Sequence, residues 1–570
     1  VLIPAQNVVN LMLKQEVVDA IKEGKIVAIK SVGGYQLICD AHNENAIIRL
    51  RKNKERSHKP FIIMVLNTQS ASQYVALTEE AKNSLESQQR PIVILPKIEN
   101  NLPTQIAPHL NTLGVMLPYT PIHYLIFERL IELKKDLHWL NNANPSALIV
   151  TSGNNYGNPI ITDDELAEKN LTDIADLIVN YNRDIVSHVD DSVVNLANNK
   201  TFFIRRARSY ALQAIELPYE IPATIALGGH LKSTICITRN NEAFVSQHIA
   251  DLTNVDSINV YHKTLNQILK LLNIKPACVA HDTHPNFYTS RIAPQFKLPI
   301  FAIQHHHAHL ASMAAQTKLT KPALGLALDG FGLGERQESW GGELMHYQKT
   351  SYSRLGSLKP VLLPGGEQVV KQPWRMAVSI LYELNKKAEL HKRFSYYPSL
   401  FQLVKLLDEK VYMPMTTSCA RLFDAISALL GICEFSTYEG QAAMMLESKV
   451  TTPTINEHGW SISDNQLNLL PLIDTILTCN QQDGANVFHG TLAAALIDWV
   501  VTNIVKFDTT NVILAGGCFL NRVLLELMIN GLKKHNLTPI FPEDAIPSDA
   551  GLSLGQAWVA GNRMIDRILR

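Results

Sequence analysis

Four of the five residues from 305 to 309 are histidine, and they follow an apolar run at residues 298–303. If this stretch opens a helix, His305 and His309 stand at positions i and i+4 on one face, where two imidazoles can bind a single cation. The alternative is a solvated polar run. Acidic residues elsewhere in the chain favour the paired-ligand interpretation.

Two aspartates are candidate partners for these histidines. Asp329 follows the apolar run 324–328, which we expect to be a strand, and Asp549 directly precedes a helical stretch. Two imidazoles with one or two carboxylates make a mixed nitrogen and oxygen site, which permits iron, zinc or manganese. The alternatives are a turn-capping role for Asp329 and a helix N-cap for Asp549.

A basic cluster occupies residues 49–59, which hold six cations in eleven positions, immediately before the apolar run 61–65. It is either a solvated, charged helix end or a phosphate site at the edge of a sheet, because lysine and arginine neutralise phosphate oxygens. The residues that carry the phosphate interpretation are Lys54, Arg56 and Lys59.

A second polar cluster, residues 150–159, has two glycines and several small side chains, including Ser152 and Asn154. Backbone N–H groups in such a turn can cradle an anion, although a plain turn has the same composition. Arg206, in a basic stretch farther along, adds positive charge.

Short apolar runs alternate with polar helical stretches up to about residue 210, which predicts an α/β domain. The runs expected to be strands are residues 26–29, 61–65, 92–95 and 147–150. Two prolines in residues 212–222 indicate an extended linker. We therefore expect one domain over residues 1–215 and another over residues 222–570.

In the second domain an apolar strand runs into a glycine turn three times. Such turns bring backbone amides close to phosphate, and three of them suggest a nucleotide held between two lobes, as in the actin, sugar-kinase and heat-shock (ASKHA) superfamily. The candidate nucleotide-binding residues are Gly228, Gly229, Gly330, Gly332, Gly516, Gly517 and Asn521.

The composition is that of a globular protein, with 46% hydrophobic and 18% charged residues. The 52 basic and 52 acidic residues balance, so net charge gives no indication of nucleic-acid binding. Seven scattered cysteines without a CxxC pair indicate a reducing cytoplasm. We find no leader and no apolar run of about 18 residues, so no membrane span is expected.

The N-terminal motifs resemble the YrdC-like nucleotide-binding family: Lys54-Glu-Arg56 with Lys59-Pro60, and Ser152-Gly-Asn154. The histidine pair with Ser548-Asp549-Ala-Gly551, and Gly516-Gly517-x3-Asn521, resemble a metal-dependent carbamoyl-transfer domain related to the enzyme that places threonylcarbamoyl on tRNA. Further segments, such as residues 30–37, 304–309 and 438–443, resemble the HypF family of carbamoyltransferases in nickel–iron-hydrogenase maturation.

This resemblance implies that the first domain forms carbamoyl adenylate from carbamate and ATP with Mg²⁺, at Lys54 and Arg56. It implies that the second domain, with one iron or zinc ion on His305, His309, Asp329 and Asp549, transfers the carbamoyl group to the C-terminal cysteine of a HypE-like acceptor. Carbamoyl phosphate would be the source of the carbamate.

Two features depart from the HypF family. Its members begin with acylphosphatase and zinc-finger modules, which this chain does not contain, so we expect the first hydrolytic step to lie outside it. Ala420 stands where we expect a glycine. The alternative functions are an O-carbamoyltransferase acting on a small-molecule hydroxyl, a threonylcarbamoyl transferase acting on tRNA, and a nucleotide-binding scaffold without turnover.

Overall fold

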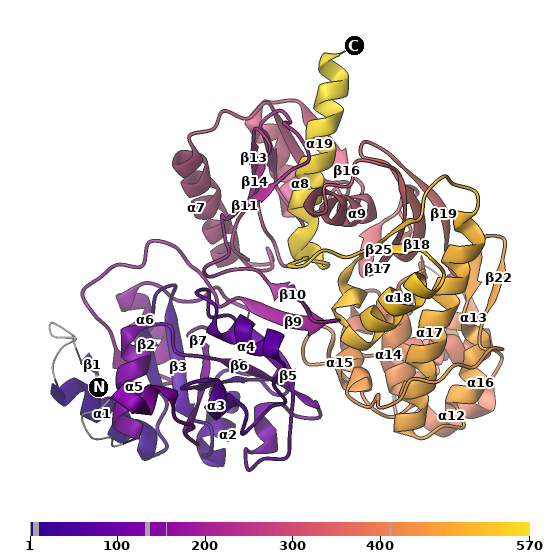
Figure 1. Cartoon of the computed structure of the whole chain (residues 1–570). Helices are drawn as coiled ribbons and strands as arrows, with labels where there is room; N and C mark the ends of the chain where they lie inside the picture. Colours follow the sequence, from indigo (N-terminus) through magenta and orange to yellow (C-terminus); the bar gives the residue numbers. More distant parts are fainter. Residues whose placement is uncertain (1, 4–10, 132–136, 156, 410–412, 570) are drawn as a thin grey trace. The chain divides into compact units, whose positions relative to one another are not determined.

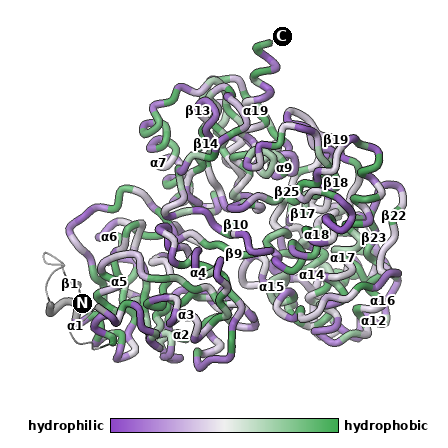
Figure 2. The backbone as a smooth tube through the Cα atoms, in the orientation of Figure 1, coloured by the Kyte–Doolittle hydropathy of each residue, from purple (hydrophilic) through white to green (hydrophobic). Residues whose placement is uncertain are grey.

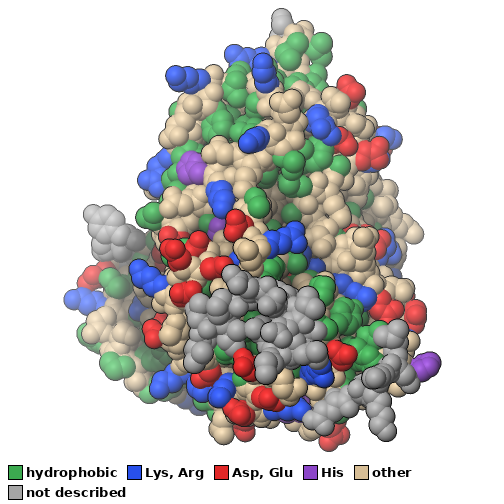
Figure 3. All heavy atoms as spheres, turned by 90° about the vertical axis from the view of Figure 1, so that its left-hand side faces the viewer, with side chains coloured by type: hydrophobic (Ala, Val, Ile, Leu, Met, Phe, Trp, Pro, Cys, Tyr) green, Lys and Arg blue, Asp and Glu red, His purple; other side chains and the backbone are tan. Residues whose placement is uncertain are grey.

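The computed structural model describes the chain except for residues 1, 4–10, 132–136, 156, 410–412 and 570. The chain divides into two compact units. The N-terminal unit contains Val1–Gln213, His230–Ser233 and Ser246–Asn273, and the C-terminal unit contains Ala214–Gly229, Thr234–Val245 and Ile274–Arg570. Acidic and basic side chains are interspersed on the face shown in Figure 3, in keeping with the zero charge balance.

In its described part, the N-terminal unit is built on one mixed ten-stranded sheet (Figure 1). The strand order is β1 (Leu2–Ile3), β8 (Leu177–Val179), β2 (Val27–Lys30), β3 (Tyr35–Asp40), β7 (Ala147–Ser152), β4 (Ile62–Val65), β6 (Thr112–Met116), β5 (Ile92–Pro96), β9 (Val193–Ala197) and β10 (Lys200–Arg205). The four predicted strands, which are β2, β4, β5 and β7, are confirmed. The helices of this unit are α1 (Leu11–Lys22), α2 (Glu44–Asn53), α3 (Thr68–Ala71), α4 (Glu79–Glu86), α5 (Pro121–Leu130), α6 (Asp164–Leu171) and α7 (Val255–Leu272).

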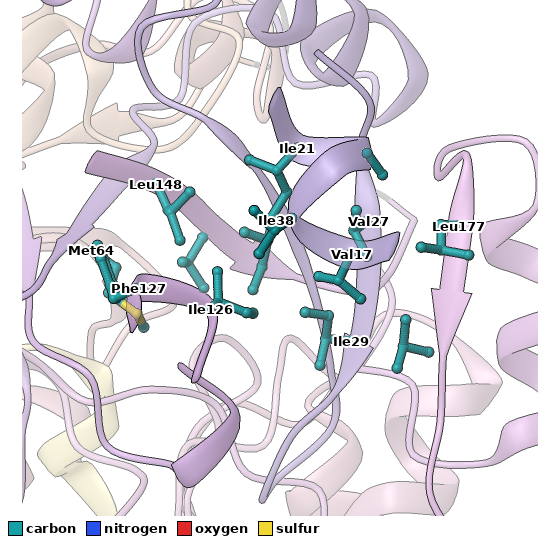
Figure 4. Close-up of a cluster of buried hydrophobic side chains, with 14 of the residues drawn as sticks. Val17, Ile21, Val27, Ile29, Ile38, Met64, Ile126, Phe127, Leu148 and Leu177 are labelled. Carbon is teal, nitrogen blue, oxygen red and sulfur yellow. The ribbon is translucent and has the colours of Figure 1, made fainter. Parts of the chain in front are cut away.

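Helices α1 and α5 cover one face of this sheet. Their apolar side chains, such as Val17 and Phe127, pack on Ile38 of β3 and Leu148 of β7 (Figure 4). Side chains alternate across a strand, so Gln36 and Ser152, two residues from Ile38 and Val150, lie on this same face. The apolar face of the sheet therefore ends in polar residues.

The C-terminal unit contains two sheets with the same core order, third-second-first-fourth-fifth. One runs β11 (Ala214–Glu216), β14 (Glu242–Val245), β13 (Cys236–Arg239), β12 (Thr224–Ala226), β15 (Cys278–Asp282) and β16 (Ile300–Ile303). The other runs β22 (Ser461–Ser463), β23 (Gln466–Asn468), β19 (Tyr352–Leu358), β18 (Ser339–Tyr347), β17 (Ala323–Leu333), β24 (Asn511–Ala515) and β25 (Thr538–Ile540), with β20 (Val361–Leu362) and β21 (Met415–Thr416) beside β18. This duplication is the two-lobed architecture predicted from the sequence.

Two central helices join these sheets. Helix α9 (His305–Gln316) packs on β17 and β24, while α19 (Leu552–Ile568) packs on β12 and β15, and the two helices contact each other. The backbones approach so closely that a Cβ on Gly555 would lie 1.8 Å from the carbonyl oxygen of Ala308. Only glycine fits this crossing.

The remaining helices of the unit are α8 (Tyr288–Ile292), α10 (Gln368–Lys371), α11 (Trp374–Glu383), α12 (Lys387–Phe394), α13 (Leu400–Glu409), α14 (Cys419–Leu429), α15 (Gln441–Glu447), α16 (Ile473–Ile476), α17 (Gln481–Ile504) and α18 (Arg522–Lys534). Among the described helices, α17 alone is long and apolar enough to cross a membrane, but 72% of its most apolar window is buried in the protein. That burial is typical of a core helix. Hydrophilic and hydrophobic stretches alternate along both units in Figure 2, as expected for elements with one buried face.

Two details differ from the sequence-based expectations. The strand expected to end at residue 328 continues as β17 to Leu333, with an irregular register between Leu328 and Gly332. Asp329 and Gly330 therefore lie in a bulged strand, not in a turn, because β17 continues to pair with β18 beyond them. The predicted linker is extended, but Ala214–Glu216 of it forms β11, which pairs with β14.

Candidate active sites

The C-terminal unit brings the four predicted metal ligands together. His305 and His309 lie in the first turns of α9, Asp329 lies in β17, and Asp549 opens a short 3-10 turn, Asp549–Gly551, before α19. Their ligand atoms all lie within 4.8 Å of one another. Asp329 Oδ2 is 3.3 Å from Nε2 of His305 and 3.2 Å from Nε2 of His309, while Asp549 Oδ1 is 3.8 and 3.6 Å from the same nitrogens.

Asp282, a residue that the sequence analysis did not single out, orients His305. Its buried carboxylate accepts a hydrogen bond from Nδ1 of His305 at 2.7 Å and another from the backbone N–H of His284 at 2.9 Å. With Nδ1 donating to Asp282, Nε2 is the nitrogen directed at Asp329 and Asp549. Carboxylate partners of this kind fix the tautomer of metal-binding histidines and raise their basicity. In the sequence, the feature that could have drawn attention to Asp282 is its position at the carboxyl end of β15.

The charges around these imidazoles are unusual for buried histidines. Burial on its own lowers a histidine pKa, but the carboxylates of Asp282, Asp329 and Asp549 outweigh it and raise the pKa of His305 well above its usual value. Burial also lowers the pKa of His309, but Asp329 and Asp549 outweigh this effect and raise that pKa above its usual value. The negative potential that holds protons here equally favours a divalent cation.

The other two histidines of the run have separate roles. His306 Nδ1 accepts from the amide of Gln304 at 3.1 Å, and burial lowers its pKa well below the usual value. Nε2 of His307 lies 2.9 Å from the carbonyl oxygen of Gln348, and burial lowers the pKa of His307 to about 4. Both rings are therefore neutral core residues, and only the i, i+4 pair faces the aspartates.

The donor set fits a transition-metal ion. Ligands about 2.1 Å from a tetrahedral ion lie about 3.4 Å from one another, and the observed nitrogen–oxygen separations of 3.2 to 3.8 Å lie on either side of that value. Two nitrogens and two oxygens suit zinc or iron. Gly332 crosses directly over the histidines: a Cβ there would lie 2.5 Å from His306 Cε1 and 2.8 Å from His305 Cδ2. Its missing side chain thus makes room for the site.

The N-terminal unit brings together Lys54, Ser152 and Asn154. The buried Lys54 ammonium donates to the carbonyl oxygens of Ser152 at 2.6 Å and Asn154 at 2.8 Å, and to Asn154 Oδ1 at 2.9 Å. The hydroxyl of Ser152 also donates to Asn154 Oδ1, at 2.8 Å. The loop therefore turns carbonyls toward a cation, whereas its sequence predicts amides turned toward an anion. The backbone N–H of Gly153 donates to Tyr35. Tyr156 lies outside the described residues.

Arg56 lies on the same edge. Its guanidinium donates to Thr151 Oγ1 at 3.2 Å and to the carbonyls of Lys59 and Pro60. Burial and the neighbouring charge of Arg56 hold the pKa of Lys54 well below its usual value. A group that carries phosphate oxygens would relieve this repulsion.

The loop itself is shaped by Arg51, which the sequence analysis counted only as part of the basic cluster. Arg51 is buried, and its guanidinium donates to the carbonyls of Gln105, Arg56, Ser57, Lys59 and Ile106. Five main-chain acceptors satisfy this buried cation, and three of them belong to the loop that carries Arg56. The loop conformation is thus set by a residue behind it.

Other predicted residues are placed as follows. Lys59 is exposed, and Arg206 is buried and donates to Gln213 O at 3.3 Å. The N–H of Gly228 donates to Gln556, and Gly229 beside it is buried. A Cβ on Gly330 would meet nothing within 4 Å. Contacts of these residues with a nucleotide stay predictions.

The third glycine turn adjoins the metal ligands. The N–H of Gly516 donates to Pro547 O, and that of Gly517 donates to Asp329 Oδ1 at 3.0 Å. Asn521 caps α18 by accepting from Leu524 N, and its amide donates to Nε2 of His489 at 3.0 Å. These bonds give the turn a role in holding Asp329, and its nucleotide role stays a prediction.

Family models match nearly the whole chain. A Sua5/YciO/YrdC model described as telomere recombination matches residues 19–207, one described as the HypF Kae1-like domain matches residues 220–316, and one described as a carbamoyltransferase Kae1-like domain, second subdomain, matches residues 325–556. Carbamoyltransferase HypF2 of Cupriavidus necator is 38% identical over 96% of this chain and 73% of its own length. The chain belongs to the HypF carbamoyltransferase family.

Two further comparisons agree. Carbamoyltransferase HypF of Rhizobium leguminosarum bv. viciae is 38% identical over 95% of this chain and 71% of its own length. The crystal structure of a full-length HypF in its phosphate- and nucleotide-bound form superposes with a TM-score of 0.90 at 35% identity, over 97% of this chain and 86% of that one. This chain is accordingly an enzyme, a carbamoyltransferase of the HypF family with a YrdC-like unit and a Kae1-like, ASKHA-type unit.

Proposed function

We propose that this chain activates carbamate in its N-terminal unit and transfers the carbamoyl group in its C-terminal unit, during maturation of a nickel–iron hydrogenase in the cytoplasm. The observation that carries the proposal is that one chain holds both a cationic cluster around Lys54 and a histidine–aspartate cluster around His305. A nucleotide-binding scaffold has no use for both.

The first step forms carbamoyl adenylate. A carbamate oxygen attacks the α-phosphorus of ATP, the new oxygen–phosphorus bond forms, and Mg²⁺-bound pyrophosphate leaves. Negative charge gathers on phosphate oxygens, where Lys54 and Arg56 stabilise it, with Lys59 and Arg206 as additional cations. Ser152 and Asn154 hold Lys54 in place. Carbamoyl phosphate is the precursor of the carbamate.

The second step moves the carbamoyl group to a thiolate. His305, His309, Asp329 and Asp549 would hold one zinc or iron ion, and a bound ion of this kind supplies Lewis-acid polarisation of a carbonyl. The acceptor thiolate attacks the carbamoyl carbon, the carbon–sulfur bond forms, and AMP leaves with the electron pair of the broken bond. The N–H of Gly517 holds Asp329 in place. The turns around the adenylate are lined by Gly228, Gly229, Gly330, Gly516 and Asn521. The acceptor is the C-terminal cysteine of a HypE-like protein, and neither nucleic acid nor membrane takes part.

The experiment is mass spectrometry of a purified HypE-like acceptor after incubation with this chain, ATP, Mg²⁺ and ammonium carbamate. We expect a gain of about 43 mass units, one carbamoyl group in place of hydrogen, on the C-terminal cysteine. An acceptor with that cysteine changed to alanine is the control. No gain while pyrophosphate is released would reject the thiol acceptor and direct attention to small-molecule hydroxyls.

A further inference from the structure

A polar cluster in the N-terminal unit has no part in the steps above. Gln36 donates from Nε2 to Tyr119 OH at 2.7 Å and to Asp191 Oδ2 at 3.0 Å, and its Oε1 lies 3.2 Å from His123 Nε2. Arg208 donates from Nε to Asp191 Oδ1 at 2.8 Å, and its guanidinium lies 3.6 Å from the centre of the Tyr119 ring. We call these five residues the Gln36 cluster.

The Gln36 cluster lies beside the cationic site. Gln36 of β3 pairs directly with Ser152 of β7, so the two side chains stand next to each other on one face of the sheet. Asp190, the neighbour of Asp191, lies close enough to Lys54 to raise its pKa against the effects of burial and Arg56. The cluster thus lies at the polar end of this face of the sheet, beside the place where Lys54, Ser152 and Asn154 meet.

Gln36 has no hydrogen-bond donor left for a ligand. Both of its N–H donors are used, by Tyr119 and Asp191, and its carbonyl accepts from His123. His123 is buried, and burial lowers its pKa to about 4, so the ring is neutral and donates from Nε2. Gln36 therefore fixes the orientation of its neighbours, and because it is buried it does not contact a ligand itself.

Asp191 and Tyr119 are the members that remain accessible. The side chain of Asp191 is 16% exposed and Tyr119 is half-buried, whereas Gln36, His123 and Arg208 are buried. One carboxylate oxygen of Asp191 accepts from Arg208 and the other from Gln36, and each has a second lone pair. The cluster thus presents rigid acceptors next to a set of cations.

We propose that Asp191 and Tyr119 bind the amino end of the carbamate and make the enzyme selective for the unsubstituted molecule, with Gln36 as a positioning residue. This inference rests on the proposed carbamate activation. Carbamate carries a carboxylate at one end, which suits Lys54, and an NH₂ group at the other, which needs acceptors. An N-substituted carbamate loses one N–H and carries extra bulk against the ring of Tyr119.

The size of the effect follows from how such sites discriminate. A site built to hydrogen-bond an N–H rejects an analogue that lacks it by far more than an apolar pocket rejects one additional methyl group, which is worth roughly 10- to 200-fold. We therefore expect the wild-type enzyme to prefer carbamate over N-methylcarbamate by at least about a hundredfold in kcat/KM.

The test follows pyrophosphate release from ATP with carbamate and with N-methylcarbamate. Tyr119→Ala removes the ring against which the N-methyl group would press, and it should lower the preference for carbamate over N-methylcarbamate at least tenfold. Gln36→Leu removes both donors and should raise the KM for carbamate about tenfold, with kcat within about threefold of wild type. Tyr119→Phe keeps the aromatic ring and should keep the preference for carbamate over N-methylcarbamate. Tyr74→Phe, which removes a tyrosine hydroxyl bonded to Pro145 elsewhere in the unit, is the matched control.

The KM for ATP reports whether each variant keeps the cationic site intact. Unchanged preference in Tyr119→Ala, together with an unchanged KM for carbamate in Gln36→Leu and a KM for ATP as in wild type, would overturn the inference. Absence of pyrophosphate from the wild-type enzyme with either carbamate would reject the proposed activation itself, and this role with it. The two failures are therefore distinguishable.

Discussion

The two candidate sites are each organised by one buried charged residue, but of opposite sign and in different ways. In the N-terminal unit Arg51 donates to five main-chain carbonyls and so shapes the loop that carries Arg56. In the C-terminal unit Asp282 accepts from His305 and so orients a ligand directly. The cationic site thus depends on loop conformation and the histidine–aspartate site on side-chain orientation.

The supporting elements differ accordingly. The cationic site lies at or beyond the ends of α2 and β7, where individual hydrogen bonds set the direction of the chain. Its residues are Lys54, Arg56, Ser152 and Asn154. His305, His309 and Asp329 lie within α9 and β17, where close packing of backbones leaves no freedom. Loss of a hydrogen bond should therefore harm the first site, and added volume should harm the second.

The largest effect is expected from Gly332→Ala. The new Cβ would lie 2.5 Å from His306 Cε1 and 2.8 Å from His305 Cδ2, so the histidines must shift. A displacement of about 1 Å can cost roughly a hundredfold in rate, and we expect that loss in carbamoyl transfer with pyrophosphate release retained. Ser353→Thr, which adds one methyl group at an exposed position of β19 in the same sheet, is the matched control. Equal transfer rates in the two variants would contradict the close-packing account.

Asp282→Asn should weaken metal binding about 10- to 100-fold, because loss of such a carboxylate partner typically has that effect. The affinity can be measured by calorimetric titration of the metal-free protein with zinc. Asp474→Asn is a control in the same unit, since Asp474 is an exposed partner of Lys386. Unchanged affinity in Asp282→Asn would mean that Asp282 does not orient His305.

Arg51→Lys should raise the KM for ATP about tenfold, because lysine offers a single ammonium in place of the planar fork that reaches five carbonyls. Pyrophosphate release at varied ATP concentration measures it. Arg49→Lys is the matched control, since Arg49 is about 42% exposed and pairs with Asp176 at the surface. A KM that rises equally in both variants would contradict the claim that Arg51 acts by shaping the loop.

The smallest effect concerns pH. In the metal-free protein burial opposes protonation of His305 and His309, but the carboxylates outweigh it and raise both pKa values above 6.5. These protons stabilise the metal-free fold below pH 6.5, and that stability is lost as pH rises through the raised values. A metal must displace them, so its affinity should increase as the pH rises above 6.5, by at most about tenfold per pH unit and proton. Titrations at pH 6.5, 7.5 and 8.5 test this, and constant affinity across the three would contradict it.

The sequence was sufficient to predict four strands of the N-terminal unit and several of the side chains that lie together at each candidate site. The i, i+4 spacing of His305 and His309 and the apolar runs before Asp329 and Ser152 are local signals, and the structure places these residues as the signals predict. For the duplicated strand order, the sequence offered only the recurrence of an apolar run followed by a glycine turn. Long-range sheet pairing has no such local signature.

What the sequence could not predict are the residues that act through distant partners. Asp282 is 23 residues from His305, and Arg51 reaches the carbonyl of Ile106, so neither forms a motif. The direction of the 152–154 carbonyls toward Lys54 and the bulge at Asp329 are likewise set by tertiary contacts. Composition alone cannot reveal which way a peptide group points.

The central claim, a division of labour between the two units, is tested most directly by measuring both half-reactions in His305→Ala and Lys54→Ala. The account predicts that His305→Ala releases pyrophosphate with ATP and carbamate at a rate near that of wild type, but gives no carbamoyl group on the acceptor cysteine. It predicts that Lys54→Ala loses both, because Lys54 stabilises charge in the first step. Equal loss of pyrophosphate release in the two variants would contradict the account.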